Sequence, residues 1–380
     1  MTDTLTRRSF VQHASAVSAG AFFGMQPAVR AAPVANVTET KVISHLPDIY
    51  HGWPTLTRRA NGQLLVVCSG GREQHVCPFG RVDLMRSDDD GGTWTFPRTL
   101  LDGPIDDRDA GVLETAKGSI LVTTFTSLAY EKSIPGKGDR RTRWLAVHNR
   151  ISAEVRKAEL GQWMIRSTDG GVTWSARYPS IVNSPHGPIQ LKDGRLLYAG
   201  KKLYTGNHEI GVCESTDDGK TWTWLAPIPT RDGDNHKDYH ELHAVETADG
   251  TLIVQIRNHN AANKHETLQS ESEDGGKTWS TPRPIGVWGL PSFLTRLRDD
   301  RLLMTYGHRR KPFGNQARVS EDHGMTWSEA IVISGDGAGG DLGYPSTVQL
   351  EDGSLVSVWY EKLPGSARAV LRQARWTLES

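Results

Sequence analysis

Short apolar runs, each entered from a polar turn, recur along the chain and predict β-strands. Six of them follow a two-residue turn, usually ending in Gly, and then one polar residue. The six turns begin at Asn61, Lys117, Asp193, Asp249, Asp299 and Asp352. Because an Asp-Gly pair between apolar runs is a strong signal for a β-hairpin, the pattern predicts six repeated hairpin units.

A second repeat alternates with the first and reads Ser-x-Asp-x-Gly-x-Thr-Trp; we call it the Asp-box turn. Its copies are Ser87–Trp94, Ser167–Trp174, Ser215–Trp222, Ser272–Trp279 and Ser320–Trp327. Ser and Asp side chains accept hydrogen bonds from nearby backbone N–H groups, and Gly supplies a positive φ. We interpret the repeat as a structural turn, in which Thr-Trp begins the next strand and the Trp packs on a neighbouring unit.

Together the two repeats predict an all-β fold, a six-bladed β-propeller with four antiparallel strands in each blade. We expect one domain over residues 41–378, with a first strand at about 41–44 that completes the last blade. The second unit carries an insertion from about 130 to 160, and its segment 143–159 is expected to be helical.

Residues 1–32 are expected to be a signal peptide outside the domain. The run Thr6-Arg7-Arg8-Ser9-Phe10-Val11 resembles the twin-arginine signal, and an apolar run from Ala14 to Phe23 follows it. Small residues around 29–32 supply a cleavage site. This pattern predicts export to the periplasm or medium; a basic tail is the alternative.

The composition of the chain limits the kinds of binding partner that we expect. Lys and Arg number 44, as do Asp and Glu, so the formal net charge of zero gives no reason to expect nucleic acid or an anionic membrane. No stretch after the signal approaches the length of a membrane span. The three cysteines imply no disulfide framework. Buried thiols are favoured over the alternative, a bridge between Cys68 and Cys77.

Polar residues of unusual kind collect a few positions before the repeated apolar strands. The five motifs are His51-Gly52-Trp53-Pro54, Asp106-Asp107-Arg108-Asp109, Ser184-Pro185-His186-Gly187, Tyr239-His240-Glu241-Leu242-His243 and Gly343-Tyr344-Pro345-Ser346. In a propeller such segments meet at one end of the central channel. The repeat therefore predicts a single axial site.

Arginines follow three of the apolar strands, at Arg72, Arg257 and Arg309. A guanidinium group binds a carboxylate through two parallel hydrogen bonds. Arginines from three blades that point into one channel would form a pocket selective for anions.

The Asp-box turns, the six blade repeats, and the pairs Glu241 with Arg257 and Tyr344 with Glu361 resemble the sialidase (neuraminidase) superfamily, in its bacterial BNR-repeat group. The resemblance covers roughly residues 45–375. In that family a Tyr is the nucleophile, a Glu beside it is the base, and three arginines hold the substrate carboxylate. An Asp on a mobile loop is the general acid/base.

Carried over by position, the resemblance implies that Tyr344 is the nucleophile and Glu241 its base. Arg257 matches the second arginine, Arg309 is a looser match for the third, and Glu361 matches the Glu that braces the first arginine. The first arginine itself is replaced by Gly52.

The segment that should carry the acid/base Asp runs from Arg72 to Gly80 and contains no Asp. Either Glu73 or His75 is therefore expected to donate the proton, with His51 and His186 as further candidates. Substrate contacts are expected from Arg72, Arg257, Arg309, His51, Asp109, His186, His240 and Glu361.

The resulting hypothesis is an exported, exo-acting glycoside hydrolase that removes a terminal acidic sugar, of sialic or uronic acid type, from a glycan. It would act as a monomer without a metal or cofactor. Two alternatives stay open. One is a uronate lyase or rhamnosyl-uronate hydrolase centred on His51, His75, His186 and His240; the other is a non-catalytic propeller that binds glycans.

Overall fold

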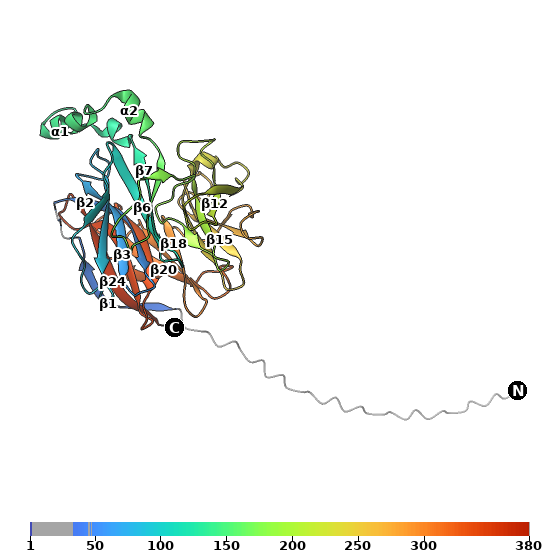
Figure 1. The fold of residues 1–380 in the computed structure, drawn as a ribbon. Helices are drawn as coiled ribbons and strands as arrows, with labels where there is room; N and C mark the ends of the chain where they lie inside the picture. The colour runs from blue at the N-terminus through green and yellow to red at the C-terminus, as the bar shows by residue number, and fades with distance from the viewer. Residues whose placement is uncertain (2–32, 45, 47, 380) are drawn as a thin grey trace. The chain divides into compact units, whose positions relative to one another are not determined.

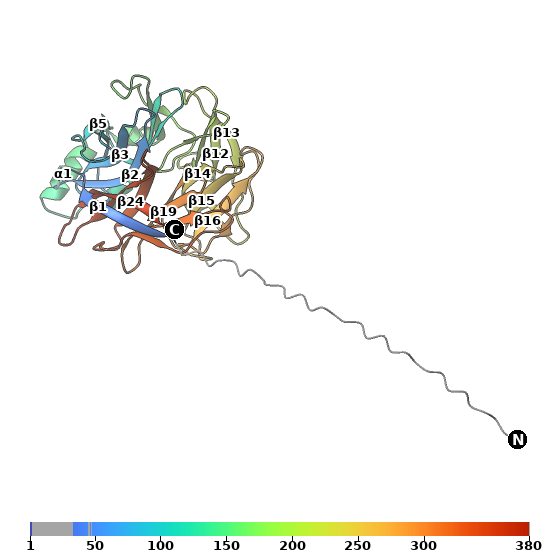
Figure 2. The same cartoon turned by 90° about the horizontal axis from the view of Figure 1, so that it is seen from below.

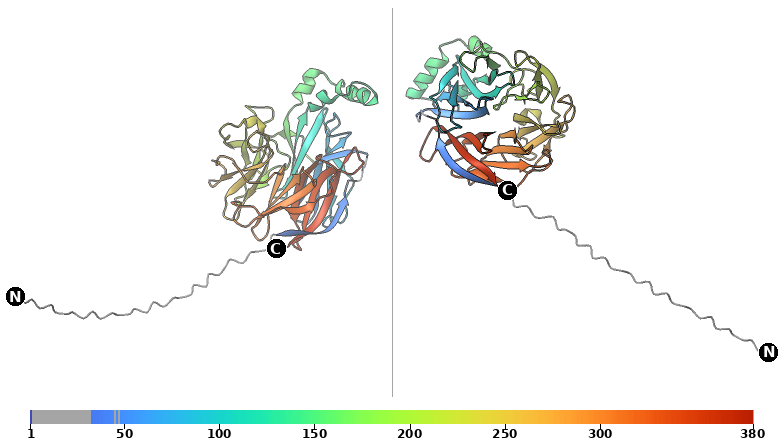
Figure 3. Two further views of the ribbon diagram at one scale, coloured as in Figure 1. Left: turned by 180° about the vertical axis from the view of Figure 1, so that it is seen from behind. Right: turned by 60° about the horizontal axis from the view of Figure 1, so that its bottom comes forward.

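Six four-stranded antiparallel sheets surround a common axis in the computed structural model, which describes residues 1, 33–44, 46 and 48–379. Figures 1 and 3 show the sheets as blades that follow one another around the ring in chain order. The prediction of a six-bladed β-propeller is confirmed. The expected signal peptide lies outside the described residues.

Each blade contains four strands, in order from the inner to the outer edge. Blade 1 contains β2 (Tyr50–Arg58), β3 (Leu64–Arg72), β4 (Arg81–Ser87) and β5 (Arg98–Leu101), and blade 2 contains β6 (Asp106–Glu114), β7 (Ile120–Ser127), β8 (Gln162–Ser167) and β9 (Tyr178–Pro179). Blade 3 contains β10 (Ile189–Gln190), β11 (Leu196–Lys201), β12 (Ile210–Ser215) and β13 (Thr223–Pro227), and blade 4 contains β14 (Tyr239–Glu246), β15 (Leu252–Asn258), β16 (Thr267–Ser272) and β17 (Arg283–Pro284). Blade 5 contains β18 (Ser292–Arg296), β19 (Leu302–His308), β20 (Gly314–Ser320) and β21 (Ile331–Ser334), and blade 6 contains β22 (Leu342–Gln349), β23 (Leu355–Lys362), β24 (Ala369–Glu379) and β1 (Val34–Val42).

The repeated apolar runs form the second strand of every blade and are buried almost throughout. Their side chains pack between neighbouring sheets, so the core is divided among the spaces between blades. One cluster, for example, joins Leu56 and Val66 of blade 1 to Val356 and Val358 of blade 6. Cys68, Cys77 and Cys213 are buried free thiols, as the sequence predicted.

The ring is closed by the first strand of the chain, which pairs with the last. β1 runs antiparallel to β24 from Val34 opposite Glu379 to Val42 opposite Arg372. Figure 2 shows the two strands side by side. The predicted closure of the last blade is confirmed, although the strand is longer than expected and begins earlier.

Most of the helical structure lies in the insertion of blade 2. It contains η1 (Ala129–Ser133), α1 (Asp139–His148) and α2 (Ala153–Ala158), and a second short turn, η2 (His236–Asp238), precedes β14. Figure 1 shows α1 and α2 beyond the ends of β6 and β7. The predicted helix is therefore two shorter ones. None of the helices among the described residues is long and apolar enough to cross a membrane.

Each Asp-box turn connects the third strand of a blade to the fourth. In the second copy Ser167 Oγ donates to Asp169 Oδ1 at 2.8 Å and accepts from the Gly171 N–H at 2.8 Å. Asp169 in turn accepts from the Thr173 N–H at 2.9 Å. The structural interpretation is confirmed, but the expectation that Thr-Trp begins the next strand is wrong in all five blades that have the turn. Only β13 starts directly after its box.

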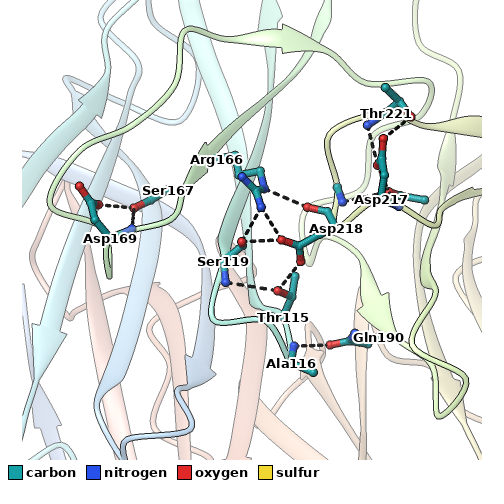
Figure 4. A network of polar contacts seen from close by, with 12 residues as sticks. Thr115, Ala116, Ser119, Arg166, Ser167, Asp169, Gln190, Asp217, Asp218 and Thr221 are labelled. Carbon is teal, nitrogen blue, oxygen red and sulfur yellow. Dashed lines mark hydrogen bonds and ion pairs between the residues drawn. The ribbon is translucent and has the colours of Figure 1, made fainter.

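The Asp-box turn of blade 3 also holds blade 2 in place (Figure 4). Asp218 accepts from the hydroxyls of Thr115 and Ser119, each at 2.6 Å, and forms an ion pair with Arg166. The Asp218 carbonyl oxygen accepts from Arg166 Nε at 2.9 Å. These contacts join two blades at the end of the propeller where the β6–β7 turn lies.

Candidate active site

Tyr344, Glu241 and Arg257 form one hydrogen-bonded group, although blades 4 and 6 contribute them from three strands. Tyr344 Oη donates to Glu241 Oε1 at 2.7 Å. Arg257 Nη1 lies 3.0 Å from the same carboxylate oxygen and 3.1 Å from Tyr344 Oη. The contact between Tyr344 and Glu241 spans 103 residues of sequence, so it depends on the propeller closing correctly.

Burial and charge give the two oxygens of this pair opposite protonation. Burial raises the pKa of Tyr344 well above its usual value near 10, and the charge on Glu241 raises it further, against the effect of Arg257. For Glu241, burial alone would raise the pKa. The charges of Arg257 and His240 and the hydrogen bond from Tyr344 outweigh burial and lower the pKa to about 2. A neutral hydroxyl therefore faces an ionised carboxylate.

Inner strands of three blades bulge at the same place, and each bulge holds a residue other than Gly with positive φ. The three are Trp53, Asp109 and Tyr344, with φ of 52°, 46° and 54°. The strand register shifts at Gly52–Thr55, Arg108–Gly111 and Gly343–Ser346. Such conformations are costly, and they concentrate at functional sites. At these bulges the rings of Trp53 and Tyr344 come to lie with their centres 6.4 Å apart.

Arg309 approaches Tyr344 from blade 5, directly after β19. Its Nε donates to the Leu342 carbonyl at 2.9 Å, and its guanidinium carbon lies 5.7 Å from the centre of the Tyr344 ring. Nη2 is buried and has no hydrogen-bond partner in the described part of the chain. Arg257 and Arg309 thus reach the tyrosine from two blades.

Arg72 does not join this pair. It is fully buried, forms an ion pair with Asp106, and lies 4.8 Å from the centre of the Trp53 indole. A second arginine, Arg108, lies 4.6 Å from the same ring. The motif that contains Arg108, Asp106-Asp107-Arg108-Asp109, predicted an axial position but no specific role for this arginine. Arg108 has the same strand register in blade 2 that Gly52 has in blade 1.

His75 packs edge-on against Trp53, with ring centres 4.9 Å apart. Its Nδ1 lies 2.9 Å from Asp341 Oδ1, a carboxylate that Tyr50 Oη also contacts at 3.0 Å and Lys362 Nζ at 2.9 Å. Asp341 therefore orients the imidazole and leaves Nε2 without a partner among the described residues. His75 remains partly exposed, which an acid/base group needs in order to meet a substrate.

Two sequence-predicted residues are paired away from Tyr344. Glu73 accepts hydrogen bonds from Arg143 at 2.8 Å and from Trp144 Nε1 at 3.0 Å, both on α1. Burial would raise the pKa of Glu73, but these hydrogen bonds outweigh it and lower the pKa, so the group is a poor proton donor. Glu361 forms its ion pair with Arg372 of β24 instead of bracing an arginine at the site.

The remaining histidines do not assemble into a common centre. Burial lowers the pKa of His51 to about 4 and of His186 to about 3, so both are neutral. The ring of His186 lies 6.2 Å from that of Tyr344, whereas His240 pairs with His259 at 4.5 Å. No contact among the described residues joins any two of His51, His75, His186 and His240. This separation argues against the histidine-centred alternative.

Two cavities lie on either side of the Glu241–Arg257 pair. One of about 140 Å³ is lined by Asp109, Phe125, Asn183, Ser184, Lys201, Leu203, His240 and Glu241. Burial, together with the charge on Glu241, raises the pKa of Asp109 to about 7 in spite of Arg108. The other cavity, of about 220 Å³, is lined by Arg257, His259, His265, Trp288, Leu290, Gly307, Arg309 and Arg310. One cavity thus contains carboxyl groups and the other contains only cationic or neutral groups.

Sequence reasoning missed Trp53, Arg108, Asp341 and His259. A signal for Trp53 was present, because Gly52-Trp53-Pro54-Thr55 repeats the spacing of Gly343-Tyr344-Pro345-Ser346. For Asp341 no local signal exists, since its contact with His75 spans 266 residues. Within the described residues, no group of three or more His, Cys, Asp or Glu side chains is arranged to bind a metal ion.

Comparison with known proteins agrees with the fold and the repeats. Residues 138–357 match the model of the BNR repeat-like domain. A sialidase of Bacteroides fragilis is 26% identical over 74% of this chain and 54% of its own length, and a xyloglucanase of Paenibacillus is 28% identical over 63% of this chain and 22% of its own. The chain thus spans about half or less of these relatives.

Solved structures share the fold at low sequence identity. A protein of unknown function from Dyadobacter fermentans has a TM-score of 0.74 at 22% identity, over 91% of this chain and 99% of its own. The intramolecular trans-sialidase of Ruminococcus gnavus has a TM-score of 0.64 at 15% identity, over 90% of this chain and 96% of its own. From the matched domain and these likenesses, the chain belongs to the BNR-repeat proteins of the sialidase superfamily.

Proposed function

We propose that this protein is an exo-acting glycoside hydrolase that removes a terminal acidic sugar from a glycan, with Tyr344 as the nucleophile. The observation that carries the proposal is the hydrogen-bonded group of Tyr344, Glu241 and Arg257. A protonated hydroxyl at 2.7 Å from an ionised carboxylate is the arrangement that activates a weak nucleophile. A neutral nucleophile also avoids repulsion of an anionic substrate.

In the first step Tyr344 Oη attacks the anomeric carbon, and its proton passes to Glu241 Oε1 as the new C–O bond forms. The glycosidic bond breaks, and the leaving oxygen takes a proton from His75. In the second step neutral His75 takes a proton from water, which attacks the same carbon. Tyr344 Oη then leaves and recovers its proton from Glu241. Two displacements retain the configuration of the sugar.

The position of Arg257 favours one kind of acidic sugar. Arg257 Nη1 lies 3.1 Å from Tyr344 Oη, the atom that bonds to the anomeric carbon. A carboxylate bound by this guanidinium and by Arg309 would therefore lie next to the attacked carbon. That position is taken by the carboxylate of a sialic-type sugar, in which the acid group is attached to the anomeric carbon itself. The carboxylate of a uronic acid is instead attached to the carbon on the other side of the ring oxygen, further from the attacked carbon.

The test is hydrolysis of 4-methylumbelliferyl glycosides of a sialic acid, a uronic acid and galactose by the purified protein. We expect release from the sialic-type substrate, and a loss of at least about 10³-fold in kcat for Tyr344→Phe without a change in Tm. Tyr306→Phe, which removes a hydroxyl hydrogen-bonded to Gln316, is the matched control. Wild-type activity in Tyr344→Phe would reject the nucleophile, and saturable binding without turnover of any acidic substrate would support a glycan-binding propeller.

We also propose that the protein is exported and acts as a monomer. The basis for export is the twin-arginine pattern at residues 6–11. The basis for a monomer is the closed ring of blades. Fractionation of cells that express the full chain, with Arg7 and Arg8 changed to Lys in a parallel culture, tests the export. Retention of the native chain in the cytoplasm would reject it.

A further inference from the structure

The 220 Å³ cavity beside Tyr344 has more cationic groups than one carboxylate needs. Three arginines line it, Arg257, Arg309 and Arg310, and no Asp or Glu lies among its lining residues. Arg257 is already neutralised by its ion pair with Glu241. Two positive charges, on Arg309 and Arg310, therefore remain without a carboxylate partner among the described residues. A single bound carboxylate would balance only one of them.

The free hydrogen-bond donors lie at two places along the cavity. Near Tyr344, Arg309 Nη2 is buried and has no partner among the described residues. At the outer side, the Arg310 guanidinium lies 5.1 Å from the centre of the Trp288 ring and forms no hydrogen bond with the described residues. Trp288 is 42% exposed, a large value for an aromatic side chain. An exposed indole beside a free guanidinium is suited to pack against a sugar ring that carries an anionic group.

Histidines supply neutral donors to the same wall. His259 accepts from Arg257 Nε at 2.9 Å through Nε2, and burial together with the nearby Arg257 lowers its pKa to about 4. His265 has φ of 64° and packs against His259 at 5.3 Å. Its backbone N–H donates to the Asn258 carbonyl at 3.0 Å, which keeps the turn in this conformation. A left-handed backbone conformation at a residue other than Gly raises the free energy of the folded state, and such conformations concentrate at functional sites.

We infer that this cavity binds a second oxyanion, a carboxylate or a sulfate ester, on the sugar to which the cleaved acidic sugar is attached. Arg257 and Arg309 hold the first carboxylate; Arg310, His265 and Trp288 hold the second sugar and its anionic group. This inference rests on the proposed function for the position of the first sugar. It adds that the natural substrate is a glycan with acidic groups on adjacent sugars.

The experiment measures Kd by calorimetry for three sulfur-linked disaccharides that resist hydrolysis. All carry the same terminal acidic sugar; the second sugar is galactose, galacturonic acid or galactose 6-sulfate. We expect one or both of the diacidic compounds to bind about tenfold more tightly than the galactose compound. The carboxylate and sulfate arms identify the source of the anion.

Arg310→Ala should remove this preference by weakening the binding of the diacidic compounds about tenfold, and Arg310→Lys should retain part of it. Arg298→Ala is the control. Arg298 lies before the start of β19, whereas Arg310 lies after its end, and Arg298 forms an ion pair with Glu351. Equal binding of all three compounds by the wild type, or a preference that persists in Arg310→Ala, would overturn the inference alone. Binding of none of them would contradict both the inference and the proposed function.

Discussion

At the scale of single residues, the candidate site combines groups that the sequence named with groups that it could not. Tyr344 and Glu241 were predicted from motifs before the repeated strands, and Arg257 and Arg309 from their positions after such strands. The structure brings the four into contact. Asp341 carries no motif of its own, and only the closed ring brings it to His75. Glu73 was a reasonable donor by position, but the insertion of blade 2 supplies Arg143 and Trp144, which hold its carboxylate.

The His75–Asp341 pair should set the basic limb of the pH profile. Burial lowers the pKa of His75 below 6.5, while Asp341 opposes that effect, and the imidazole must be protonated to donate. The rate should therefore fall as pH rises through the pKa of His75, whereas Glu241, with a pKa of about 2, stays ionised. In Asp341→Asn the opposing charge is lost, so the limb should move to lower pH and kcat/KM at pH 7 should fall about tenfold.

The measurement is kcat/KM between pH 3.5 and 8 for the wild type, Asp341→Asn and a control variant, Asp336→Asn. Asp336→Asn is the control, since Asp336 is an exposed carboxylate five positions away that pairs with Arg372. The same displacement in both variants would mean that general surface charge is responsible. An unmoved limb in Asp341→Asn would remove His75 from the proton-transfer step.

At the scale of elements, the inner strands and the ends of the second strands hold the candidate site, and the Asp-box turns join neighbouring blades. Hairpin positions could be predicted because Gly, Asp and Asn at turns act locally. The bulges were not predicted, because each is a local shift of strand register and not part of the repeated turn pattern. The resemblance expects an arginine where this chain has Gly52. Arg108 has the same strand register in the next blade and lies beside the indole of Trp53.

Asp218 should contribute to stability without affecting catalysis. Its carboxylate accepts from Thr115, Ser119 and Arg166 of the neighbouring blade, so Asp218→Ala should lower the free energy of unfolding by about 2 kcal/mol. Asp90, the matching position of the first Asp-box turn, has no such contacts with described residues, and Asp90→Ala is the control. Urea denaturation followed by fluorescence measures both. Equal losses in the two variants would show that the contact between blades is unimportant.

At the scale of the whole molecule, the propeller is a closed ring whose closure depends on β1. The sequence predicted six blades because a turn before an apolar strand recurs six times, and it predicted the closing strand from a strand that precedes the first repeat. It could not predict which cavities open between blades, because cavity shape depends on side chains more than 100 residues apart, such as Glu241 and Tyr344.

Removal of β1 should open the ring. A chain that begins at Ile43 leaves the edge of β24 unpaired and uncovers the packing of Ala35 and Val37 on Trp359 and Trp376. Its Tm should fall on the order of 10 °C relative to a chain that begins at Pro33, and it should aggregate through the exposed edge. Scanning calorimetry and light scattering compare the two chains. Equal Tm values would mean that the other three strands of blade 6 suffice.

The central claim is that Tyr344 forms a covalent bond with the sugar. The most direct test is mass spectrometry of the protein treated with a fluorinated sialic-type sugar fluoride, which slows the second displacement. We expect the mass to rise by one sugar unit, the labelled peptide to contain Tyr344, and Tyr344→Phe to remain unlabelled. Rapid turnover of the same compound with no adduct, or an adduct on a residue other than Tyr344, would contradict the account.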